Sequence, residues 1–233
     1  MTYYTEIGYN FVMKNLYNAL LLKQLYQLKN LGYRYTSEKP FSYDHKHSVQ
    51  LSDNLQELKK QAQNCHLCSL SKSRTKSVFG EGNKRADILF VGDMPMAQED
   101  QEGRIFLGRG GEMLTLMIEK VLGVSRQEVY ITNLLKCHPL HTQSPKPTTL
   151  HTCKSYLFKE ISIIKPKIVV TLGEMAYHYL TNDTTPLAQI RGREIKQVSY
   201  TLIPTYHPNF LLKNPSFKKE VLSDLKKIRE FLL

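Results

Sequence analysis

A chain of 233 residues fits one ordinary α/β domain, or one domain with an appendage. Its 41% of apolar and 23% of charged residues exclude a disordered chain, and the longest aliphatic run near its start, residues 19–22, excludes a bilayer-spanning helix or a signal-peptide core there. We therefore expect a soluble, cytoplasmic protein, and its net charge of +11 indicates a polyanionic partner.

The first 54 residues differ in composition from the rest. They hold eight of the fourteen tyrosines and a net charge of +2, whereas residues 55–233 carry +9. Apolar residues recur at helical spacing over about 8–31, and Gly32 follows as a helix stop. The sequence predicts an N-terminal helical extension over 1–54, with a polar connector over 36–50, and a separate domain over 55–233.

From Asp53 onward, predicted helices and strands alternate. Asp53, with Gln56 three residues later, predicts the start of a helix that leads toward Cys65. Four apolar runs rich in β-branched residues predict strands over 87–92, 129–133, 167–173 and 200–207. Helices are expected over about 110–122, 149–164, 174–181 and 216–232, with an irregular turn or small hairpin at 192–198. This alternation predicts a three-layer α/β/α fold with a central four-stranded parallel sheet.

Functional side chains stand at the predicted strand ends. Asp93, Asn133 and His207 each follow or end a strand, and Gly173 ends the remaining one. In open parallel α/β sheets, ligands bind outside the carboxyl ends of the strands. These residues therefore indicate a binding or catalytic site, although polar residues also commonly end strands without such a role.

The four cysteines indicate a metal centre, because disulfides are rare in a reducing compartment. Cys65 and Cys68 form a C-x-x-C pair that can clamp a thiophilic metal, while Cys137 and Cys153 flank the start of a predicted helix. Four thiolates suit either a tetrahedral zinc ion or a [4Fe–4S] cluster, and the lack of a second tight pair favours the cluster. Four unrelated core thiols are the alternative.

A glycine-rich run follows the first predicted strand, from Gly92-Asp93-Met94-Pro95-Met96 to Gly110-Gly111. It lacks both the P-loop sequence and a G-x-G-x-x-G turn, which disfavours nucleotide binding. Together with the segments 131–139, 172–173 and 206–209 and with the cysteine spacing, this run resembles the family-4 uracil-DNA glycosylases. The resemblance covers about 55–233 and does not extend to 1–54.

The resemblance implies a DNA repair enzyme that flips uracil out of single- or double-stranded DNA and hydrolyses its N-glycosidic bond to leave an abasic site. It also implies a structural [4Fe–4S] cluster, with zinc as the alternative, held by Cys65, Cys68, Cys137 and Cys153. No metal would be needed for the hydrolysis itself.

Site roles follow from the same resemblance. Asp93 and His207 match the two catalytic residues. Asp93 would stabilise the sugar cation or orient the attacking water, and His207 would stabilise negative charge on the uracil O2. Phe106 matches the stacking aromatic, Asn133 the uracil reader, and Glu99 a position said to exclude the thymine methyl group. Phe210, Leu211 and Lys213 match the loop that probes the duplex beside the lesion.

The first motif departs from the family pattern Gly-Glu-Ala/Gly-Pro-Gly. Asp93 is one methylene shorter than glutamate, and Met94 and Met96 replace small residues at a turn near the base. Their side chains would narrow the substrate pocket, reshape its preference or require a different turn conformation. A uracil- or damaged-DNA-binding protein of the same fold, without turnover or with altered specificity, therefore stays open as an alternative, as does an electron-transfer protein. The extension over 1–54 would cap the domain, pair with another copy or dock a repair partner.

Overall fold

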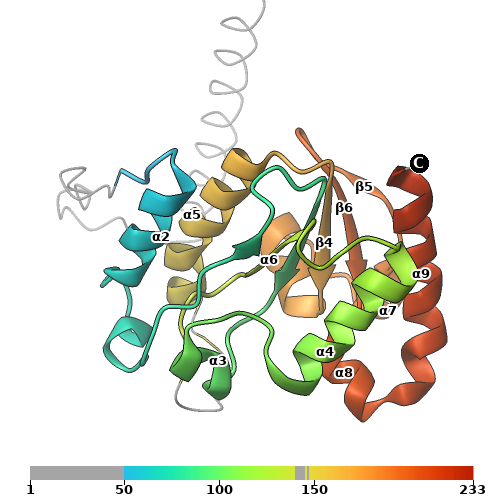
Figure 1. The fold of residues 1–233 in the computed structure, drawn as a ribbon, viewed down its shortest axis with the longest axis horizontal. Coiled ribbons are helices and arrows are strands. Elements are labelled where there is room, and N and C mark those ends of the chain that lie inside the picture. Colours follow the sequence, from blue (N-terminus) through green and yellow to red (C-terminus); the bar gives the residue numbers. More distant parts are fainter. Residues whose placement is uncertain (1–49, 140–144, 146, 233) are drawn as a thin grey trace, which may run out of the picture. The chain divides into compact units, whose positions relative to one another are not determined.

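The computed structural model describes residues 50–139, 145 and 147–232, which belong to one unit, Gln50–Leu233 (Figure 1). The helix predicted over 8–31 and most of the connector lie outside the described residues. Strands and helices alternate along the described chain, which confirms the predicted mixed α/β class.

A six-stranded sheet with the order β1-β3-β2-β4-β6-β5 forms the centre of the unit. Four strands are parallel and entirely buried: β3 (Tyr130–Asn133), β2 (Ile88–Gly92), β4 (Ile168–Leu172) and β6 (Thr201–Thr205). These are the four predicted strands. The predicted sheet was too small, because the two-residue strands β1 (Glu81–Gly82) and β5 (Ile195–Lys196) add an antiparallel edge on each side. β5 lies within the stretch 192–198, where an irregular turn or small hairpin was expected, whereas β1 was not predicted. Two residues carry too little periodicity to be recognised as a strand in a sequence.

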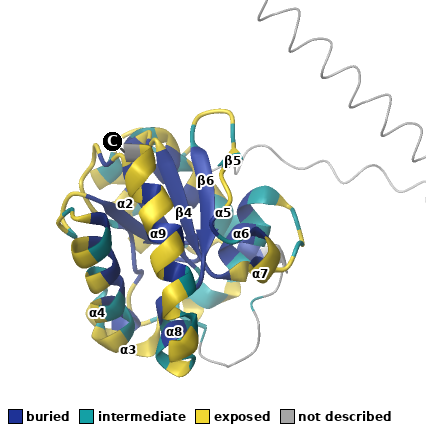
Figure 2. Cartoon of the chain, turned by 90° about the vertical axis from the view of Figure 1, so that its right-hand side faces the viewer, coloured by how far each residue is buried: buried dark blue, intermediate teal, exposed yellow. Residues whose placement is uncertain are grey.

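Helices cover both faces of the sheet, as predicted for three layers. Figure 2 shows the buried strands β4 and β6 between α9 (Lys218–Leu232) and α4 (Gly108–Leu116) on one side and α6 (Glu174–Thr181) on the other. The long helix α5 (Pro147–Ile164) packs beside α2 (Leu55–Gln63). The shorter elements are η2 (Ser69–Lys72), α3 (Ala97–Glu102), η3 (Met117–Leu122), α7 (Leu187–Ile190), α8 (Pro208–Lys213) and η4 (Pro215–Phe217).

The winding of the chain reverses beside β2. The chain passes from β2 to β3 through α4 and η3, and then returns across β2 to β4 through α5. In open α/β sheets such a reversal leaves a crevice at the carboxyl ends of the strands, and ligands bind there. The topology therefore places a site at the ends of β2 and β4.

Some element boundaries differ from the predictions. The helix predicted over 110–122 is α4 followed by η3, a π-helical segment. The helix start predicted at Asp53 was wrong by one residue, because Asn54 Oδ1 accepts hydrogen bonds from the amides of Gln56 and Glu57. Asp53 instead pairs with Lys159, 2.6 Å away.

Apolar side chains of the strands and covering helices form the main core, among them the fully buried Leu89, Val170 and Ile203. A smaller cluster, which includes Leu58, Phe79 and Tyr156, joins α2 to α5. Among the described helices, none has the length and apolarity that crossing a membrane requires.

Candidate active site

The carboxyl ends of the central strands border an open cleft of about 770 Å³. Asp93 after β2, Asn133 at the end of β3 and His207 after β6 all line it. Gly173 follows β4, and a Cβ atom added there would lie 3.3 Å from Asp93 Oδ2 and 3.5 Å from the Cβ of His207. The structure thus brings together the four positions that the predicted strand ends indicate.

Asn133 presents an unpaired amide to this cleft. Its side chain is 1% exposed, and neither Oδ1 nor Nδ2 has a hydrogen-bond partner among the described residues. A Cβ atom at Gly92 would lie 2.3 Å from Asn133 Oδ1 and 2.8 Å from Cζ of Phe106, so only glycine leaves room for both side chains there. A buried amide without partners is costly, and a ligand that offers both a donor and an acceptor would satisfy it.

Phe106 forms one wall of the cleft. It is 7% exposed, and its ring stacks on that of His207 with a centroid separation of 5.6 Å and an interplanar angle of 25°. Its backbone has a φ of 51°, in the left-handed region that residues other than glycine rarely adopt. The ring face is therefore held beside the histidine by an unusual backbone conformation.

His207 caps the short helix α8 with its own ring. Its Nδ1 accepts a hydrogen bond from the amide of Asn209, 3.1 Å away. Burial lowers the pKa of His207 to about 4, so the ring is neutral near pH 7. Because Nδ1 is an acceptor, the single proton of the neutral ring lies on Nε2.

The carboxylate of Asp93 is held by a hydrogen bond from α6, the helix that follows the neighbouring strand β4. Its Oδ1 accepts a hydrogen bond from the amide of Ala176, in the first turn of α6, at 2.9 Å. Burial raises the pKa of Asp93 to about 6, and the bond from Ala176 partly opposes this shift. The carboxylate is therefore ionised at neutral pH but close to its titration range.

The carboxylate of Glu99 is hydrogen-bonded to the backbone rather than free to contact a ligand. It is 5% exposed, and its two oxygens accept hydrogen bonds from the amides of Met96 and Leu107 at 2.9 and 3.1 Å. Burial raises the pKa of Glu99, and these backbone donors oppose the shift. The side chain borders the cleft, but its oxygens are occupied in joining the turn before α3 to the segment around Phe106.

The three residues expected to contact DNA lie on α8 and face different ways. Phe210 and the exposed Lys213 line the cleft. Leu211 is 1% exposed and belongs to the main core, so its expected contact with DNA does not fit its position. Leu212, the next residue, borders the cleft instead.

Both methionines of the unusual first motif border the cleft. Met94 is half-buried against the core, whereas Met96 is 53% exposed at the rim. Sequence reasoning missed further lining residues, among them Gln98, Arg109 and Asn209. The close approach of Asn209 to Gly110, where a Cβ atom would lie 2.0 Å from Asn209 Oδ1, depends on long-range packing that has no local sequence signal.

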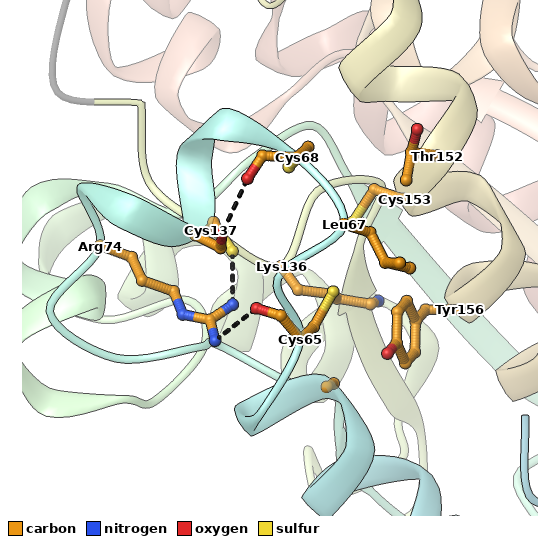
Figure 3. Close-up of a pocket in the computed structure, with 11 residues that line it drawn as sticks. Cys65, Leu67, Cys68, Arg74, Lys136, Cys137, Thr152, Cys153 and Tyr156 are labelled. Carbon is orange, nitrogen blue, oxygen red and sulfur yellow. Dashed lines mark hydrogen bonds between the residues drawn. The ribbon is translucent and has the colours of Figure 1, made fainter. Parts of the chain in front are cut away.

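The four cysteines surround one pocket on a different part of the unit (Figure 3). All four are free thiols from the segment after α2, the segment after β3, and α5. Arg74 donates to Cys137 Sγ at 3.1 Å and to the carbonyl oxygen of Cys65 at 3.0 Å. Burial raises the pKa of Cys153 to about 12. Within the part of the chain that the structure describes, no group of three or more His, Cys, Asp or Glu side chains is arranged to hold a metal ion.

The segment that follows β3 connects this pocket to the cleft. The amides of Leu134 and Leu135 donate to the carbonyl oxygens of Gly92 and Asp93 at 2.8 and 3.0 Å. Lys136 Nζ donates to the carbonyl oxygen of Asn133 at 2.7 Å, and Cys137 comes next in the chain. One short segment therefore carries the unpaired amide, part of the cysteine pocket and the backbone that fixes Asp93.

A buried amide, a stacking aromatic ring and a neutral histidine at the switch point of a parallel sheet define a site for a planar, hydrogen-bonding ring. Residues 79–226 match the model of the uracil DNA glycosylase superfamily. The type-4 uracil-DNA glycosylase of Sulfurisphaera tokodaii is 39% identical over 189 residues, which cover 78% of this chain and 86% of the relative. The chain therefore belongs to the uracil DNA glycosylase superfamily and, within it, to the type-4 uracil-DNA glycosylases.

Two further type-4 uracil-DNA glycosylases agree with this assignment. The relative from Saccharolobus solfataricus is 37% identical over 188 residues, covering 77% of this chain and 87% of the relative. The relative from Thermotoga maritima is 37% identical over 172 residues, covering 72% of this chain and 89% of the relative.

Proposed function

We propose that this protein removes uracil from DNA by hydrolysing the N-glycosidic bond, which leaves an abasic site. The observation that carries the proposal is the Asn133 amide, which is buried at the edge of the cleft and whose two polar atoms have no partner among the described residues. Uracil presents a donor, N3–H, next to an acceptor, O4, and one amide group complements both. An unpaired buried polar group costs about 1–3 kcal/mol, and binding of such a base would recover this free energy.

Base reading requires that the nucleotide leave the helix stack. In the proposed complex the base lies against the ring of Phe106, while Asn133 reads its edge. The half-buried Met94 narrows the same cleft, and Glu99 supports its wall from behind. Phe210 and Lys213 border the outer part of the cleft, where we infer that DNA lies.

Asp93 and His207 supply the proposed chemistry. The bond from C1′ to N1 breaks, its electron pair passes to the base, and the resulting negative charge on O2 is stabilised by the Nε2–H of neutral His207. The sugar becomes cation-like, and a water molecule adds to C1′. The ionised Asp93 stabilises this cation or accepts the proton of the water.

We also propose that Cys65, Cys68, Cys137 and Cys153 hold a [4Fe–4S] cluster. No three of these thiols are arranged to hold a metal ion in the described structure, but their donor chemistry suits a cluster. All four line one pocket, and the Arg74 guanidinium donates to the sulfur of Cys137, an interaction that tunes such clusters. The cluster would join sequence-distant segments, and it has no part in the proposed hydrolysis. The uracil-excising domain would be 55–233, and residues 1–54 would be an accessory extension.

An oligonucleotide with a single uracil tests the main proposal. Treatment with excess protein, followed by alkaline cleavage, should give one product with single- and double-stranded DNA. Asn133→Ala and His207→Ala should each slow excision by about 100-fold or more, since one well-placed donor is worth about 10²–10³ in rate. The exposed Asn83→Ala is the matched control and should excise at the wild-type rate.

Two outcomes would contradict the proposal. Absence of product at protein excess, with uracil-dependent binding retained, would indicate a binding protein of the same fold. Equal activity of the Asn133→Ala and Asn83→Ala variants would remove Asn133 from base reading.

A chain that begins at Gln50 should excise uracil like the full chain if 55–233 is the excising domain.

A further inference from the structure

The conformation of Phe106 needs support from outside its own segment. Its φ of 51° is unfavourable for a side chain with a Cβ atom, and such a conformation persists only where surrounding contacts determine it. The ring must nevertheless stay beside His207 to form a wall of the cleft. The contacts that hold residues 105–107 therefore decide whether the stacking surface exists.

Arg126 donates hydrogen bonds to two backbone carbonyl groups of this segment. Its Nη2 donates to the carbonyl oxygens of Ile105 and Phe106 at 3.2 and 3.3 Å. Its Nη1 donates to Thr115 Oγ1 at 2.9 Å and to the carbonyl oxygen of Gly111 at 3.3 Å, both in α4. The guanidinium thus joins the loop that carries Phe106 to the helix that follows it.

Two neighbours restrict the same backbone further. Glu99 Oε1 accepts a hydrogen bond from the amide of Leu107 at 3.1 Å, on the other side of Phe106. At Gly111 a Cβ atom would lie 1.7 Å from the carbonyl oxygen of Phe106, so this oxygen occupies space that only glycine leaves free. The carbonyl of Phe106 is therefore directed toward Arg126 and α4.

We propose that Arg126 is a positioning residue for base stacking: it holds Phe106 in the left-handed conformation that presents its ring to the extruded base. The inference rests on the proposed uracil excision, and it assigns a role to a residue outside the cleft wall. Arginine suits this task because its planar group donates several hydrogen bonds in a fixed geometry, which lysine does not reproduce.

A double-mutant cycle tests the inference with the full-length protein. Phe106→Ala removes the stacking ring, and Arg126→Gln removes the clamp. Each should slow single-turnover excision by about 10- to 100-fold, since a displacement of about 1 Å in a catalytic site costs up to about 100-fold. The double variant should be no slower than Phe106→Ala alone, because the clamp acts only through that ring. Losses that multiply would overturn the proposal.

Two controls separate positioning from general destabilisation. Arg104→Gln removes a guanidinium that is 65% exposed and lies 3.8 Å from Glu81, and it should leave excision unchanged. Arg126→Lys keeps the charge, replaces Arg126→Gln in the cycle if that variant does not fold, and should show the same coupling to Phe106→Ala. Equal excision by Arg126→Lys and the wild type would overturn the need for the guanidinium geometry.

A fluorescence readout does not depend on excision. The chain contains no tryptophan, so Phe106→Trp introduces a single reporter at the stacking position. Adding Arg126→Gln should increase its quenching by acrylamide, whereas adding Arg104→Gln should not. Unchanged quenching would overturn the inference, and a wild-type protein that fails to excise uracil while the reporter responds would overturn only the proposed function.

Discussion

Asp93 and His207 lie in the same cleft, and burial shifts both toward their neutral forms. The pKa of Asp93 rises to about 6 and that of His207 falls to about 4, so near pH 7 the carboxylate is charged and the ring is neutral. The sequence predicts which residue types meet at the strand ends. It does not predict their protonation, because burial and the amide of Asn209 decide it. Leu211 was misjudged for a similar reason, since the core that buries it is built from elements that are distant in sequence.

Asp93→Asn should raise stability while it removes activity. Asparagine can still accept the bond from Ala176 but carries no buried charge. The penalty of the wild-type carboxylate begins near pH 4, where the unfolded chain ionises, and is complete above about pH 6. The gain in unfolding free energy should therefore grow with pH to at most about 3 kcal/mol, at about 1.4 kcal/mol per pKa unit.

Urea unfolding at pH 5 and pH 8 measures this difference, and Asp87→Asn, at an exposed carboxylate, is the control. Excision by the wild type should rise with pH through about 6, as Asp93 ionises. The Asp93→Asn variant should lose about 100-fold or more, in the range expected for a general base. If the Asp93→Asn variant is less stable than the wild type at pH 8, burial does not destabilise the charged form of Asp93 as we infer.

The elements that the sequence predicts best are those with continuous apolar runs or with apolar residues repeated at helical spacing. All four central strands and the helices α5, α6 and α9 follow from apolar runs. The helices α3, α7 and α8 have six, four and six residues, too few for a periodic pattern, and they form because of specific caps and tertiary contacts. His207 caps α8 through its ring, and Glu99 bonds to the amide of Met96 at the start of α3.

A buried ion pair joins β3, the segment after it and α5. Lys136 and Glu160 are 2% and 0% exposed, and Glu160 also accepts bonds from Tyr130 and Thr132. Lys136→Met should lower the unfolding free energy by about 3–5 kcal/mol, because it leaves a buried carboxylate unpaired. Lys167→Met breaks an exposed pair with Asp87 and should cost less than about 1 kcal/mol. Equal costs in urea unfolding would contradict this account.

At the scale of the whole molecule, the cysteine pocket joins segments that lie far apart in the chain. The four cysteines stand at positions 65, 68, 137 and 153, so a bound cluster would link the segment after α2 to the sheet and to α5. The spacing indicates thiolate ligation of a metal centre, but it does not reveal that Arg74 donates to one of the sulfurs. The net charge of +9 over 55–233 belongs to the same unit as the cleft.

Cys137→Ser should remove iron and acid-labile sulfide and abolish a broad visible absorption band. Loss of the cluster should also lower the free energy of unfolding. The Tm should therefore fall by at least about 5 °C, since each 1 kcal/mol lost lowers the Tm of a domain of this size by about 2–4 °C. Leu67→Ala changes the same pocket without touching a thiol and should keep both iron and colour. A colourless wild-type protein that contains zinc would contradict the cluster and keep the four-thiolate site.

The two-residue strands at the margins of the sheet affect how copies of this protein meet at high concentration. A long open edge offers unpaired backbone groups to another chain and promotes intermolecular β-pairing. In the described unit a two-residue antiparallel strand lies at each edge of the four parallel strands, and each of these short strands carries a charged residue, Glu81 on β1 and Lys196 on β5. Such edges give a second copy little backbone to pair with, which favours a protein that stays dispersed when it is concentrated.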